Sequence, residues 1–144
     1  MDPEKTVLAV DDDYQVLIGL ERRLSQAGYR VLTATNGQDA LDQVRTHLPD
    51  AISLDVRLPG DVDGLEVAAC LKKDLRTAKI PIIFVTGSAD DQFKRRCQTS
   101  GGKYFIAKPY DPDLLLQMLS TILATDELAE IKRISSAKRR QPTF

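Results

Sequence analysis

Short apolar runs alternate with segments of helical spacing five times along this chain. The apolar runs predict buried strands, because each is four to six residues long and is bounded by polar residues. The segments between them carry apolar residues three or four positions apart, which is the period of a helix with one buried face. The pattern predicts strands at 6–10, 30–34, 51–56, 81–85 and 104–107, and helices at about 14–27, 37–47, 64–75, 90–99 and from 112 onward.

Residues with strong end preferences stand at the predicted helix boundaries. Gly28 lies where the first helix should end, and Asn36 and Asp63 precede the second and third helices. Asp111 and Pro112 supply a cap and a first helical residue for the last one. Strands joined through helices pair in parallel, and their right-handed crossovers cover both faces of the sheet. We therefore predict an α/β, doubly wound domain with a five-stranded parallel sheet.

Composition narrows the class of protein. The 144 residues are enough for one packed domain, and 42% hydrophobic with 28% charged residues is typical of a soluble globular chain. Lys plus Arg (20) nearly balance Asp plus Glu (21), so the charge gives no reason to expect direct nucleic-acid binding. No apolar run is long enough to cross a membrane, and only two cysteines, Cys70 and Cys97, are present. We expect a cytoplasmic protein without a membrane partner.

Chemically complementary side chains follow four of the predicted strands. Because the carboxyl ends of parallel strands meet at one edge of a sheet, where such folds bind ligands, we expect these groups to converge. They are the acids Asp11, Asp12 and Asp13 after the first strand, the acid Asp55 at the third, the hydroxyl of Thr86 at the fourth and the amine of Lys108 at the fifth.

The run of three acids needs an explanation of its own. Two carboxylates about 4 Å apart near a protein surface repel by roughly 4 kcal/mol. A helix cap accounts for one of them, since Asp favours that position. A cap does not explain the other two, so a cation that offsets their repulsion is a hypothesis to test against the rest of the chain.

Four motifs then resemble, in order and spacing, the receiver domain of two-component response regulators over residues 6 to about 124. The motifs are Val10-Asp11-Asp12, Leu54-Asp55-Val56-Arg57-Leu58-Pro59-Gly60, Val85-Thr86-Gly87 and Lys108-Pro109-Tyr110. The resemblance implies a flavodoxin-like sheet with strand order 2-1-3-4-5. It also implies a phosphoacceptor signalling domain rather than an enzyme, which takes a phosphoryl group from a histidine kinase or a phosphotransfer protein.

The resemblance assigns roles within the site. Asp55 would accept the phosphoryl group, while Thr86 and Lys108 would contact its oxygens. Mg²⁺, with Mn²⁺ as a substitute, would be held by Asp11 and Asp12 together with Asp55 and the backbone carbonyl of Arg57. Asp13 is then left as the helix cap, and the Lys108-Pro109 peptide bond would be cis.

The resemblance also implies a conformational switch and residues that set the lifetime of the phosphorylated state. Thr86 would couple to Phe105 and reshape a surface made by the predicted helix at 90–99, the last strand and the last helix, which would bind an unknown downstream protein or a second copy. Arg57 and Ser88 would flank the water that hydrolyses the phosphate. The loop between the third strand and third helix is one residue longer than the family's usual Leu-Pro-Gly-x-Asp-Gly pattern.

Two alternatives belong to other classes of protein, and a third places the receiver within a larger regulator. A haloacid-dehalogenase-like phosphatase also has an Asp-x-Asp pattern after its first strand, but this chain has Gln15 where that family normally has Thr or Val. Nucleotide-binding enzymes of this fold class carry a glycine-rich phosphate loop, which is missing here. A receiver that forms part of a larger DNA-binding or enzymatic regulator also stays open, although about twenty residues after 125 are too few for a helix-turn-helix domain.

The last segment, 126–144, is predicted as an extension of a receiver domain at 1–125. Leu128, Ile131 and Ile134 recur every three residues, and acids precede bases, which suits a helix and its dipole. Two interpretations remain open, an extension of the fifth helix or a short separate helix that binds a partner. The basic residues at 138–140 favour a solvated tail over a nucleic-acid contact.

Overall fold

One parallel sheet contains every predicted strand. The structure, a computed structural model, describes residues 4–87, 95–96 and 104–139. The strand order is β2-β1-β3-β4-β5, and all four neighbouring pairs are parallel, so the predicted topology is confirmed. The strands are β1 (Thr6–Val10), β2 (Arg30–Ala34), β3 (Ala51–Asp55), β4 (Ile82–Thr86) and β5 (Tyr104–Ala107).

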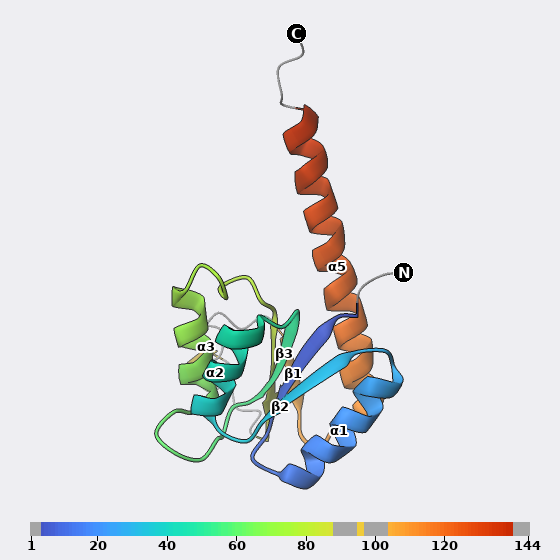
Figure 1. Ribbon diagram of the computed structural model, residues 1–144. Helices are drawn as coiled ribbons and strands as arrows, with labels where there is room; N and C mark the ends of the chain where they lie inside the picture. The colour runs from blue at the N-terminus through green and yellow to red at the C-terminus, as the bar shows by residue number, and fades with distance from the viewer. Residues whose placement is uncertain (1–3, 88–94, 97–103, 140–144) are drawn as a thin grey trace.

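Helices cover the sheet on both faces and create two apolar cores (Figure 1). Successive strand residues point to opposite faces, so Leu8 and Val10 pack with one helical layer while Val7 and Ala9 pack with the other. The layer over Leu8 and Val10 consists of α2 (Gly37–His47) and α3 (Gly64–Lys73), and the opposite layer of α1 (Tyr14–Gln26) and α5 (Pro112–Arg139).

The predicted end signals form real caps. The side chain of Asn36 accepts a hydrogen bond from the Asp39 N–H (2.8 Å), and Asp63 accepts one from the Glu66 N–H (2.9 Å). Gly28 has a φ of +99°, a conformation that glycine adopts without steric cost. Each helix therefore starts or stops where the local chemistry satisfies its free backbone groups.

Several boundaries differ from the prediction. The helix α3 ends at Lys73 rather than near 75, because the chain turns there and the Thr77 hydroxyl donates to the Leu71 carbonyl (2.6 Å). The third strand stops one residue earlier than predicted, and the fourth lies one residue further along. Of the helix predicted at 90–99, residues 95–96 are helical and the rest lie outside the described residues.

The fifth helix is longer than the domain requires. It runs without a break to Arg139 and projects beyond the sheet (Figure 1), so the segment after 125 extends α5 instead of forming a separate helix. Within the described part of the chain, no helix combines the length and the apolar character needed to span a bilayer.

Candidate functional site

The three acids after β1 have three different environments. Asp13 caps α1, with its side chain accepting a hydrogen bond from the Gln15 N–H (3.0 Å), as the sequence predicts. Asp11 is buried, and its Oδ1 accepts a hydrogen bond from the Asp13 N–H (2.9 Å). Asp12 is exposed. The α1 cap therefore accounts for Asp13, while Asp11 and Asp12 both face the rim of the sheet.

The Lys108 ammonium contacts two acids at that rim, Asp11 after β1 and Asp55 at the end of β3. The Nζ of Lys108 lies 2.8 Å from Asp55 Oδ2 and 3.3 Å from Asp11 Oδ2. The other oxygen of Asp55 accepts a hydrogen bond from the Arg57 N–H (3.2 Å). Asp55 is thus held by a charge on one oxygen and a backbone donor on the other. The Lys108-Pro109 peptide bond is cis, as the resemblance implied.

Burial and charge act in opposite directions on these groups. Burial raises the pKa of Asp11, and the neighbouring Asp55 adds to the rise, although the Asp13 N–H and Lys108 oppose it. Burial by itself lowers the pKa of Lys108, but its bonds and charge interactions with Asp55 and Asp11 leave that pKa above its ordinary value. Lys108 therefore stays positively charged beside the two acids.

The geometry of the acids fits a divalent cation. Asp11, Asp12 and Asp55 each offer one carboxylate oxygen, and the three oxygens lie within 4.8 Å of one another. A donor set made only of oxygens, with one member open to solvent, suits an ion that keeps several of its waters. Of the predicted ligand set, the three side chains are brought together.

A pocket of about 230 Å³ opens beside Asp55. Thr86 is buried at the end of β4, and its carbonyl accepts a hydrogen bond from the Lys108 N–H (2.8 Å), which fixes the start of the β5–α5 connection. Ser88, predicted to flank the site, lies outside the described residues. The pocket is lined by Asp12, Asp55, Val56, Arg57, Thr86, Gly87 and Lys108.

Phe105 lies on the same face of the sheet as Thr86. The register pairs Thr86 with Ala107 and Phe84 with Phe105, so the strand alternation places Thr86, Phe84 and Phe105 on one side. The Phe84 and Phe105 rings stack with centroids 5.9 Å apart, and Phe105 is only partly buried. Thr86 at the pocket and the stacked Phe84 and Phe105 therefore lie along one face of β4 and β5.

Two glycines position the connection after Asp55, and sequence reasoning did not assign them this role. A Cβ on Gly64 would lie 2.2 Å from the Asp55 carbonyl oxygen, and one on Gly37 would lie 2.2 Å from the Val62 carbonyl oxygen. Both approaches exclude any side chain. The only hint in the sequence is that each glycine follows a helix-capping residue.

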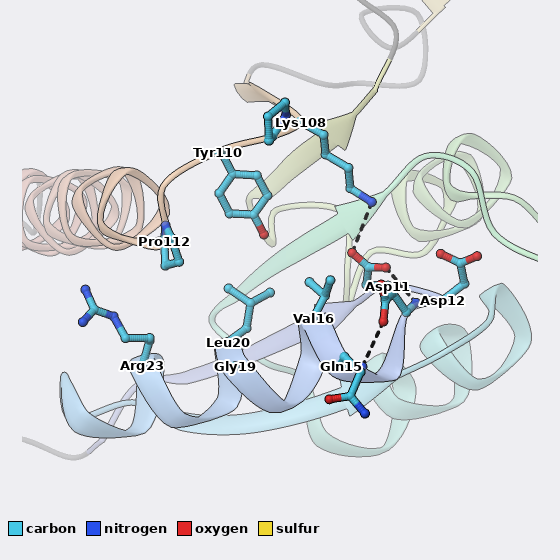
Figure 2. A pocket seen from close by; sticks show the side chains of 12 residues that line it. Asp11, Asp12, Gln15, Val16, Gly19, Leu20, Arg23, Lys108, Tyr110 and Pro112 are labelled. Carbon is cyan, nitrogen blue, oxygen red and sulfur yellow. Dashed lines mark hydrogen bonds and ion pairs between the residues drawn. The ribbon is translucent and has the colours of Figure 1, made fainter.

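A second, larger pocket of about 800 Å³ shares Asp12 and Lys108 with the first (Figure 2). Val16, Gly19 and Leu20 of α1 form one wall, and Tyr110 and Pro112 after β5 form the other. Burial raises the pKa of Tyr110, and the charge of Asp11 adds to the rise. This pocket is more apolar in its lining residues than the one beside Asp55, and it was not predicted.

The chain belongs to the response regulator receiver domain family, whose model matches residues 7–120. The acidic pocket of Asp11, Asp12 and Asp55 with Lys108 is typical of the phosphoacceptor site of such domains. This membership sets aside the phosphatase and nucleotide-enzyme alternatives. The chain is a signalling domain rather than a classical enzyme.

Relatives occur both as short proteins and as parts of longer ones. The chain is 32% identical over 118 residues to the protein PilH of Pseudomonas aeruginosa, covering 82% of this chain and 97% of PilH. It is 35% identical over 127 residues to the alkaline phosphatase synthesis transcriptional regulatory protein PhoP of Bacillus subtilis, covering 87% of this chain. The chain spans about half (51%) of the length of PhoP.

Solved structures agree with the fold. A response regulator from Chloroflexus aurantiacus superposes with a TM-score of 0.78 at 37% identity, covering 85% of this chain and 99% of that one. A CheY-like receiver domain protein from Methanospirillum hungatei gives a TM-score of 0.82 at 27% identity, covering 88% of this chain and 99% of that one.

Proposed function

We propose that Asp55 accepts a phosphoryl group from the phosphohistidine of a histidine kinase or a phosphotransfer protein. An oxygen of Asp55 forms the new bond to phosphorus while the bond from phosphorus to the histidine nitrogen breaks. The observation that carries this proposal is the position of Asp55, buried at the base of a small open pocket with Lys108 Nζ 2.8 Å away.

The other groups of the pocket support transfer to a carboxylate. Phosphoryl transfer mainly needs positioning and neutralisation of charge. The Arg57 N–H orients Asp55, and the Lys108 ammonium would reach from Asp55 to the incoming phosphoryl oxygens. Thr86, at the same pocket, would donate a hydrogen bond to one of those oxygens.

We further propose that the ion of this site is Mg²⁺, with Mn²⁺ as a substitute. Asp11, Asp12 and Asp55 would hold it, with the Arg57 carbonyl as a fourth protein ligand. When bound, the ion would neutralise charge on the phosphoryl oxygens and the acids. Asp11 would hold the ion rather than accept the phosphoryl group, because Asp55 lines the pocket beside Lys108 and Asp11 does not.

Signalling would follow from the added charge. Thr86 turning to the phosphoryl group would vacate space beside the stacked Phe84 and Phe105, so that Phe105 can move and change the surface around β5 and α5. Receiver-domain membership supports a histidine kinase partner, and we propose a cytoplasmic location for the same reason. We assign 1–125 to the receiver domain and 126–144 to an extension.

Labelling with acetyl phosphate tests this proposal. With Mg²⁺ or Mn²⁺ we expect one phosphoryl group on Asp55, mapped by mass spectrometry, and no labelling when the ion is chelated. Asp55→Asn should abolish labelling, while Asp13→Asn, which alters only the α1 cap, should label like the parent chain. Equal labelling of Asp55→Asn and the parent would refute the assignment.

A further inference from the structure

The larger of the two pockets has no part in the proposed function. Its volume of about 800 Å³ falls within the range of about 300–1,000 Å³ that is typical of small-molecule sites. It lies between α1 and the segment that joins β5 to α5 (Figure 2). Val16 and Leu20 line it from α1, and Tyr110 and Pro112 line it from the other side. A flat apolar molecule would therefore contact protein on two sides.

Gly19 keeps this pocket open. It lies in the interior of α1, where glycine makes a helix less stable than other residues do. A Cβ at this position would meet nothing within 4 Å, and the backbone there is not left-handed, so neither packing nor conformation requires a glycine. Gly19 does line the pocket, and a longer side chain would extend into it. The visible effect of this glycine is thus the open space beside α1.

The charges around the pocket decide which ligands fit. Toward α5, Arg23 forms an ion pair with Asp113, so its charge is balanced within the protein. Lys108 also lines the pocket, but its ammonium contacts the acids at the rim of the sheet. Asp12 and Asp13 are exposed lining residues, and no lysine or arginine in the described part of the chain forms an ion pair with either. This end of the pocket is therefore negatively charged.

We propose that the pocket binds a small organic cation with a flat, apolar body. The body would lie over Gly19, between α1 and the Tyr110 ring, and the cationic group would face Asp13. We choose Asp13 because it is not one of the three acids whose geometry fits a divalent ion. The Tyr110 hydroxyl points toward α1 and offers the ligand one further hydrogen bond (Figure 2). Binding would not depend on phosphorylation, so it can be tested without a phosphodonor.

Titration with biphenyl-4-carboxamidine, a flat apolar molecule with one positive charge, tests the proposal. By two-dimensional NMR we expect the backbone amides of 15–23 and 110–111 to shift, with a dissociation constant of about 1 mM or below. Biphenyl-4-carboxylate has the same body and a negative charge, so it should bind about tenfold or more weakly. Excess Mg²⁺ is present in both titrations, so that the probe does not compete for the acids that would hold the ion. Absence of these shifts, or equal binding of the two probes, would overturn the proposal.

Two substitutions test where the probe lies. Gly19→Leu should weaken binding of the amidine by about tenfold or more, because the new side chain occupies the space of the body, and leucine favours the helix. Ser25→Leu is the matched control, since it adds the same side chain at an exposed position of α1 that does not line the pocket. Asp13→Asn, which can still cap α1, should weaken the amidine by about threefold or more without weakening the carboxylate. Equal binding by the two leucine variants, or equal loss of both probes in Asp13→Asn, would overturn the proposal.

Discussion

The Nζ of Lys108 lies 2.8 Å from Asp55 Oδ2, although 53 residues separate the two in sequence. The contact crosses the edge of the sheet, from the end of β5 over β4 to the end of β3. It is maintained from both sides, because the Lys108 N–H donates to the Thr86 carbonyl and the Arg57 N–H donates to Asp55. The same ammonium that neutralises Asp55 would also contact the oxygens of an incoming phosphoryl group.

Lys108→Ala should slow phosphorylation of Asp55 from acetyl phosphate by ~10²-fold at saturating Mg²⁺, because a charged donor to the developing phosphoryl oxygens is lost. The initial labelling rate measures this effect. Lys79→Ala removes an exposed charge of the same kind on the α3–β4 connection and should leave the rate unchanged. Labelling of Lys108→Ala at the parent rate would mean that the contact with Asp55 serves only the resting state.

Gly64→Ala should destabilise the fold by about 1–3 kcal/mol, since the new methyl group would collide with the Asp55 carbonyl and force the β3–α3 turn to shift. Urea unfolding followed by circular dichroism measures the change. Gly19→Ala is the matched control, because a Cβ there meets nothing within 4 Å on α1, and it should stabilise by about 0.5–1 kcal/mol. Equal effects of the two substitutions would contradict the packing argument.

The sequence was sufficient for the fold and for most of the site, because both depend on patterns that the backbone enforces. Alternation within β1 selects which helices it meets, and parallel strands bring Asp11, Asp55 and Lys108 to one edge. The close approach of Gly37 to Val62 could not be predicted, because it depends on the path of a loop with an extra residue. The early end of α3 likewise depends on a contact between Thr77 and Leu71 that no periodicity encodes.

Phosphorylation, or beryllium fluoride as its mimic, should shift the backbone amide resonances of residues 86–110 more than those of α2. The reason is the shared face of Thr86, Phe84 and Phe105, along which a movement of Thr86 can propagate, whereas α2 covers a distant part of the sheet. Two-dimensional NMR of the labelled protein measures these shifts. In Thr86→Val, which keeps the volume and removes the hydroxyl, the shifts around Phe105 should fall by about half or more, since valine has no donor that would draw the side chain toward the phosphoryl group. Uniform shifts across both regions would exclude this route.

Arg57→Ala should accelerate hydrolysis of the phosphoryl group on Asp55 by about threefold or more, which lowers the barrier by roughly 0.65 kcal/mol. Arg57 is exposed and lines the pocket directly beside Asp55, so its long side chain can cover the approach of water or pair with the phosphoryl oxygens. The backbone N–H that orients Asp55 remains in the alanine variant, so the phosphorylation rate itself should change little.

Arg22→Ala, at an exposed position on α1, is the control for the loss of one positive charge. The measurement is the decay of labelled protein after removal of the donor. Decay identical to that of the parent would show that Arg57 points away from the phosphoryl group, and slower decay would show that the guanidinium assists hydrolysis instead of blocking it.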